Sequence, residues 1–212
     1  MRAKPGRALR GAVESGPWAN NVRFSQAISE GDGISLIVDV ADADAAKAAE
    51  SQGAEAVAVT RAIDLRESIE LPILWRAEGG PSAAAVAGAD AWLISVTAAG
   101  DDGEWLTRQH AEAIELGLDC VVEVRNEEEL ELALERLDPE IFLLTGAADD
   151  DEDALERALE LLPDVPAGKL AVAEVPVSTR DQVEQLERAG VDAVIVGAGN
   201  IAELVGQLPP QV

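Results

Sequence analysis

Several residue types are scarce in this 212-residue sequence, which has one cysteine, one methionine, three lysines and no tyrosine. The single cysteine, Cys120, excludes an intrachain disulfide and a thiolate metal cluster, so we expect a cytoplasmic protein. Aromatic residues make up only 3% of the chain, so aliphatic side chains must fill the core. No apolar run approaches the roughly 18 residues that span a bilayer, and no apolar segment follows the basic N-terminal residues.

Basic residues are also scarce. Sixteen lysines and arginines stand against 41 aspartates and glutamates, which gives a net charge of −25. Such a surface repels nucleic acids and anionic membranes, so neither is expected as a partner. The acidic surface fits adaptation to high salt and equally fits an ordinary, highly charged protein.

Apolar runs preceded by glycine recur along the chain. The segment 190–200 reads as a turn, an apolar strand and a glycine-bearing loop, and the same opening occurs at 53–56, 88–91 and 117–120. Each copy follows a helical pattern. A glycine that ends a helix and leads into a buried strand explains all of them, and the repetition indicates a repeated βα unit.

Strands and helices are expected to alternate through most of the chain. Helices show a 3.6-residue period, as in Leu130, Leu134 and Leu137. Residues 1–22 read as an N-terminal arm with a short helix at 7–14, and 23–212 as the folded domain, which begins with a helix at 23–29. The expected strands are 34–40, 56–60, 72–76, 91–97, 120–125, 140–145, 169–175 and 193–197, and the expected helices are 44–52, 62–69, 82–87, 104–116, 127–137, 151–162, 179–189 and 201–208.

Eight βα units in about 200 residues predict a single compact (β/α)₈ TIM barrel in the α/β class. A doubly wound open sheet is the weaker alternative. It usually carries a glycine-rich phosphate loop after its first strand, where this chain has Asp39–Asp42.

Function in such a barrel lies where the strands end. Glu123 and Glu174 stand near the ends of apolar strands, and each reads either as a general acid or base or as part of a structural ion pair. For Glu123 the partner of such a pair would be Arg76 or Arg125. Arg76 is a candidate clamp for a carboxylate or phosphate, whereas Arg125 is also able to face outward towards the acidic helix that follows it.

The loop Gly197-Ala198-Gly199-Asn200 precedes the last expected helix. Free amides at a helix N-terminus form an anion site, and glycines allow close approach, so this loop is a candidate phosphate site. The alternative is a tight turn in which Asn200 caps the helix.

Several segments resemble the indole-3-glycerol phosphate synthase family. Leu116–Leu130 is similar to the family's fifth-strand segment, Pro72–Arg76 to its third strand, Gly53–Thr60 to its second and Val172–Gly197 to its last two. The similarity covers roughly residues 23–205. It implies a barrel that closes an indole ring on a carboxyphenylamino deoxyribulose phosphate, with release of carbon dioxide and water, in tryptophan biosynthesis.

The resemblance also implies roles for particular positions. Glu123 and Glu174 match the fifth- and seventh-strand glutamates, and Gly197 and its loop match part of the phosphate cradle. Arg76 stands where the family has its general-acid lysine, and an arginine is a poor proton donor. Pro176 replaces a phosphate-loop glycine and lacks an amide donor.

Ile37 and Asp39 stand where the family's first strand has a glutamate and a lysine, so the mouth of the barrel is expected to be acidic. Three functions remain open: the family reaction, an altered reaction on a phosphosugar, and ligand or partner binding without catalysis. In each case we expect a small phosphorylated ligand, no cofactor, no metal and a monomer or homodimer.

Overall fold

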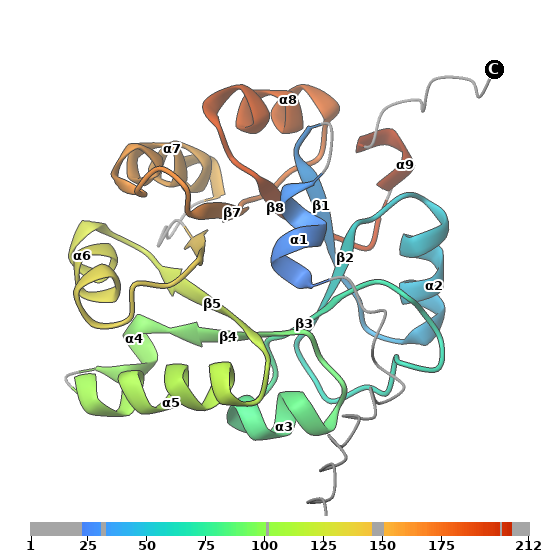
Figure 1. The fold of residues 1–212 in the computed structure, drawn as a ribbon. Coiled ribbons are helices and arrows are strands. Elements are labelled where there is room, and N and C mark those ends of the chain that lie inside the picture. The colour runs from blue at the N-terminus through green and yellow to red at the C-terminus, as the bar shows by residue number, and fades with distance from the viewer. Residues whose placement is uncertain (1–22, 31–32, 101, 146–150, 200, 205–212) are drawn as a thin grey trace, which may run out of the picture.

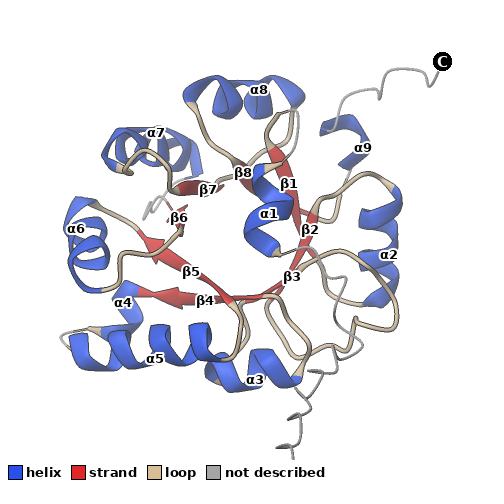
Figure 2. Cartoon of the chain, in the orientation of Figure 1, coloured by secondary structure: helices blue, strands red, loops and turns tan. Residues whose placement is uncertain are grey.

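The computed structural model describes residues 23–30, 33–100, 102–145, 151–199 and 201–204. Eight parallel strands follow one another around a closed barrel, and β1 pairs with β8 to complete the ring. Figure 2 shows this ring of strands with the helices other than α1 outside it. The strands are β1 (Ser35–Asp39), β2 (Ala56–Val59), β3 (Ile73–Trp75), β4 (Ala91–Ser95), β5 (Asp119–Val124), β6 (Ile141–Thr145), β7 (Leu170–Glu174) and β8 (Ala193–Gly197). The predicted TIM barrel is confirmed.

Several of the helices are capped at their N-terminus by a side chain. Asp42, Asp102, Asn126 and Thr179 each accept a hydrogen bond from the amide three residues later, which satisfies a donor that the helix itself leaves free. The helices are α1 (Phe24–Ser29), α2 (Ala43–Ser51), α3 (Gly80–Val86), α4 (Val96–Ala99), α5 (Gly103–Glu115), α6 (Glu127–Arg136), α7 (Asp151–Leu161), α8 (Arg180–Ala189) and α9 (Ile201–Leu204), and a 3₁₀ turn spans Leu162–Asp164. None of the described helices is long and apolar enough to cross a bilayer.

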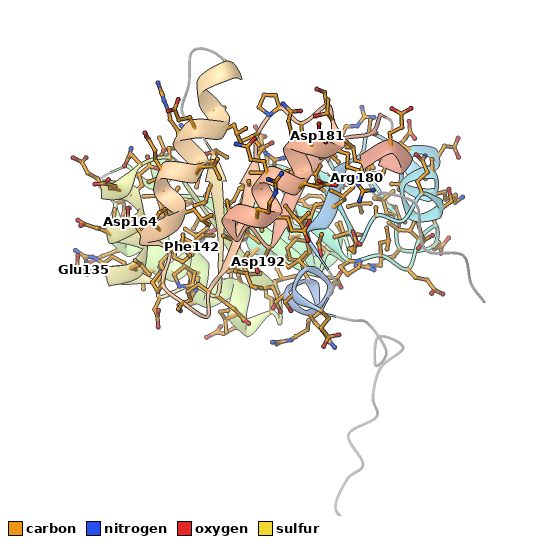
Figure 3. All side chains as sticks on the ribbon, turned by 90° about the horizontal axis from the view of Figure 1, so that it is seen from above. Glu135, Phe142, Asp164, Arg180, Asp181 and Asp192 are labelled. Atoms are coloured by element: carbon orange, nitrogen blue, oxygen red, sulfur yellow. The ribbon has the colours of Figure 1, made fainter. Side chains whose placement is uncertain are left out.

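Two apolar layers result from the alternation of side chains along each strand. One layer fills the inside of the barrel and includes Ile37, Leu74, Val121 and Val172. The other lies between the strands and the surrounding helices, where Phe142 is fully buried (Figure 3). Because the inner residues recur at every second position, they fix which side chains reach the open rim.

The N-terminal end of the barrel is closed by α1, which lies over the centre of the ring in Figure 1. Phe24 and Ile28 of this helix are buried among the inner-layer side chains. The amide of Ser25 donates to Asp119 Oδ2 at 2.8 Å, and Ser35 Oγ donates to the carbonyl of Ile28 at 3.3 Å. Asp119 and Ser35 begin their strands, so α1 seals this end and leaves the other end for function.

The helix expected at 62–69 does not form, and the connection from β2 to β3 is a loop (Figure 2). Only one turn is present, in which Ser68 and Ile69 donate to the carbonyl of Leu65. Arg66 bonds instead to the carbonyl of Gly88 and to the carboxylate of Asp90, which ties the loop to the segment before β4. These tertiary bonds outweigh the helical periodicity of the segment.

The end of one expected strand differs from the structure, and one further expectation is not tested by it. The fourth strand ends at Ser95 rather than at 97, because the chain turns directly into α4. The expected helix 7–14 and the arm 1–22 lie outside the described residues, so the division at residue 22 stays a prediction.

Candidate active site

Polar residues end most of the strands at the open rim. Each lies two positions beyond an inner-layer residue, so each continues the inward-facing row. Arg76 follows Leu74, Glu123 follows Val121, and Glu174 follows Val172. The complete row comprises Asp39, Thr60, Arg76, Ser95, Glu123, Thr145, Glu174 and Gly197. The rim therefore gathers the predicted catalytic residues at one end of the barrel.

Arg76 and Glu174 form an ion pair across this rim, from β3 to β7. A terminal nitrogen of Arg76 lies 2.7 Å from Glu174 Oε2, and their side chains are 14% and 34% exposed. Arg76 Nε is buried and has no hydrogen-bond partner among the described residues. Leaving an N–H unpaired in such a position is costly.

Glu123 lies in a second polar cluster, beside β6. Its Oε1 accepts a hydrogen bond from Thr145 Oγ1 at 3.2 Å, and Arg125 lies 3.4 Å from the same oxygen. The expected pairing with Arg125 is thus present, and the outward orientation of Arg125 is not: only its backbone amide reaches Glu129. Thr145 is paired with Glu174 in the β6–β7 register, so the two clusters are neighbours.

Arg61 was not singled out by the sequence analysis. Its side chain donates to the carbonyl of Ala41, which joins the loops after β1 and β2 at the rim. The signal was available, because Arg61 follows the expected end of the second strand. Arg61 is exposed and follows the inward-facing Thr60, so the expected acidic mouth stays a prediction.

The glycines of the loop after β8 face open space. A Cβ added to Gly197 or Gly199 would meet nothing within 4 Å, so neither glycine is required by the packing of the described residues. The amide of Gly199 already donates to the carbonyl of Gly197, and the amide of Ile201 to that of Gly199. Asn200 lies outside the described residues. Phosphate binding by this loop stays a prediction.

The loop after β7 has fewer free donors than a phosphate cradle needs. Pro176 has no amide hydrogen. The amides of Ser178 and Thr179 donate to Gln182 Oε1 at 2.9 and 3.2 Å, as parts of the cap of α8. The amides of Gly199 and Ile201 after β8 are bonded as well, so an anion at the rim would rely mainly on the arginines.

The rim offers carboxylates for proton transfer and guanidinium groups for anion binding, which together suit acid–base chemistry on an anionic substrate. Cys120 takes no part as a nucleophile, because burial and the neighbouring Asp119 raise its thiol pKa to about 12. Among the described residues, no group of three or more histidine, cysteine, aspartate or glutamate side chains is arranged to hold a metal ion.

Comparison with protein families gives a match over more than half of the chain. Residues 82–203 match the family model described as indole-3-glycerol phosphate synthase. Among curated proteins, the indole-3-glycerol phosphate synthase of Alkaliphilus metalliredigens is 35% identical over 121 residues, which cover 57% of this chain and 46% of the relative. The indole-3-glycerol phosphate synthase of a Geobacillus species is 32% identical over 173 residues, which cover 72% of this chain and 64% of the relative. The chain thus spans less than two thirds of the length of these relatives.

Solved structures support the fold alone. A chain of the tryptophan synthase α2β2 complex from Pyrococcus furiosus has a TM-score of 0.62 at 15% identity, and the match covers 82% of this chain and 98% of that one. A chain described as "Native KDPGal structure" has a TM-score of 0.59 at 16% identity, with coverage of 80% and 92%.

Proposed function

Because the chain belongs to the indole-3-glycerol phosphate synthase family, we propose that it is a carbon–carbon lyase that acts on an anionic phosphosugar. The reaction is the family's decarboxylating ring closure or a close relative of it. The observation that carries this proposal is the placement of Arg76, Glu123 and Glu174 on one inward-facing row at the open rim.

Ring closure requires that a carbonyl oxygen accept a proton as the new carbon–carbon bond forms, that the carboxylate leave as carbon dioxide, and that a hydroxyl leave as water. Glu123 gives a proton to the departing hydroxyl and recovers one from the substrate CH2 group next to nitrogen as the indole double bond forms, while solvent supplies the proton that the carbonyl oxygen accepts. Thr145 and Arg125 hold the same oxygen of Glu123 and so fix the direction of this carboxyl group.

Arg76 does not act as the general acid. Its guanidinium stays charged at all relevant pH, so it stabilises negative charge on the substrate without giving up a proton. Glu174 holds the Arg76 guanidinium at the mouth, where an anionic oxygen of the substrate would bind it. The phosphate lies against the β8 loop, at Gly197, Ala198 and Gly199, with Asn200 next to them.

A second function is supported by a separate observation. The position of the general-acid lysine holds an arginine in an ion pair, and the amides after β7 are already bonded to Gln182. Both features fit a barrel that binds a phosphosugar and does not convert it.

One experiment separates these functions. Purified protein is incubated with carboxyphenylamino deoxyribulose phosphate, and the indole product is followed by fluorescence while thermal unfolding is measured with substrate and with product. Turnover supports the lyase, and thermal stabilisation without turnover supports the binding protein. If neither is observed, the phosphosugar proposal fails in both forms.

A further inference from the structure

A large groove lies at the opposite end of the barrel from the proposed active site. It has a volume of about 830 Å³ and runs between the β2–β3 loop and the segments that precede β4 and β5. Residues that line it include Asp64, Glu67, Val86, Asp90, Leu116 and Asp119. We call this feature the N-face groove, since it lies at the N-terminal ends of the strands.

Apolar side chains are exposed beside this groove. Val86, Ile114 and Leu116 are 90%, 56% and 44% exposed and are the exposed large hydrophobic residues of the described chain. Val86 and Leu116 line the N-face groove, and Ile114 lines a smaller cavity that shares Arg23 and Asp119 with it. Gathered on one face, such residues mark an interaction surface.

The charge of the groove is negative. Its lining has four carboxylates, Asp64, Glu67, Asp90 and Asp119, against the two guanidinium groups of Arg23 and Arg66. Asp64 and Glu67 are exposed and form no ion pair within the described part of the chain. A partner for this surface needs positive charge together with apolar side chains.

Residues 1–22 have this composition. They contain Arg2, Lys4, Arg7 and Arg10 against a single acid, Glu14, whereas residues 23–212 carry 12 basic and 40 acidic side chains. The segment also contains Leu9, Val13 and Trp18. A second copy of the folded domain offers only another strongly acidic surface, which is electrostatically unfavourable.

The position of the segment in the chain fits as well. It joins the described chain at Arg23, which itself lines the groove and pairs with Asp119 at 3.9 Å. Trp18 is five residues away, so an extended chain carries it up to roughly 17 Å from Arg23. We propose that residues 1–22 bind in the N-face groove of their own chain, with apolar side chains on Val86 and Leu116 and basic side chains near Asp64 and Glu67.

Cross-linking in the full-length chain tests this. The variant S15C/V86C places one cysteine in the segment and one in the groove, and S15C/A98C is the matched control, since Ala98 is exposed beyond β4 at the other end of the barrel. Val86 and Ala98 are exposed, so both substitutions leave the core intact. Native Cys120 is buried and does not compete for the reagent.

With a short bismaleimide, we expect intramolecular cross-linking of S15C/V86C at least fivefold above that of S15C/A98C. Adding R7S and R10S to S15C/V86C should lower its yield at least threefold, because these residues supply the charge. Equal yields from the two pairs, a preference for A98C, or cross-links only between separate chains would overturn the proposal. The last result would assign the groove to a segment from a second copy.

Discussion

The guanidinium group of Arg76 lies 2.7 Å from the carboxylate of Glu174, although the two residues are 98 positions apart in the chain. The pair joins β3 to β7 across the mouth of the barrel. The ion pair therefore links two distant strands and also fixes the position of the arginine that faces the proposed substrate.

We expect E174Q to lower the free energy of unfolding by about 1–3 kcal/mol, because the pair is only partly exposed and Arg76 loses its counter-charge. The double variant R76M/E174Q should be less destabilised than the sum of the single variants. Urea unfolding of all four proteins measures this coupling. The exposed pair Arg180–Glu184 is the control, and R180M/E184Q should show coupling below about 0.5 kcal/mol. Additive effects at Arg76 and Glu174 would show that the ion pair contributes nothing.

R76K tests the role assigned to the arginine. A lysine transfers protons far more readily than an arginine, and general acid–base catalysis contributes about 10²–10⁴-fold in rate. We predict that R76K raises kcat with the family substrate at least about tenfold, whereas R125K does not. Steady-state kinetics on both variants measure this. A fall in kcat for R76K would show that this position contributes by its planar, bidentate geometry instead.

Cys120 should be unreactive in the folded protein. Burial raises its thiol pKa to about 12, so about 10⁻⁴ of the thiol is ionised at pH 8, against roughly a quarter of an unperturbed thiol. Reaction with Ellman's reagent at pH 8 should be at least about a thousandfold slower in buffer than in urea. Rapid labelling of the native protein would indicate that β5 opens frequently.

Glu55 links stability to pH. Burial raises the pKa of its carboxyl group above 4.5, even though the amide of Leu36 donates to it at 2.8 Å and opposes the shift. The folded state therefore binds the proton more tightly than the unfolded state, and stability is lost as pH rises from 4.5 through the folded pKa.

E55Q removes the half-buried charge and keeps an acceptor for the amide of Leu36. We expect it to raise the melting temperature relative to the wild type at pH 7 and not at pH 3.5, where Glu55 is already protonated. Exposed Glu135 (Figure 3) gives the control E135Q, which should show no such difference. Calorimetry at the two pH values measures the effect, and an E55Q advantage at both would contradict the assigned cause.

The sequence predicts the barrel well because buried parallel strands must be apolar and because the turns before several of them require glycine. Gly53, Gly88, Gly117 and Gly190 all have positive φ, as the repeated helix-to-strand joint requires. The helix at 62–69 was predicted wrongly because Arg66 bonds to groups more than 20 residues away, and local periodicity carries no information about them.

Only part of the candidate site could be predicted from the sequence. The positions of Arg76, Glu123 and Glu174 at strand ends follow from the period of two, which the sequence displays. Their partners depend on the closure and register of the barrel, which bring β3 opposite β7 and Thr145 beside Glu123. The bond from Arg61 to Ala41 likewise depends on the neighbouring positions of β1 and β2.

The most direct test of the account is the turnover of carboxyphenylamino deoxyribulose phosphate by the wild type, by E123Q and by the surface control E135Q, with folding verified by circular dichroism. If Glu123 transfers the proton, E123Q should lower kcat by about 10²–10⁴-fold, while E135Q matches the wild type. An E123Q protein that is folded and as active as the wild type would contradict the proposed active site.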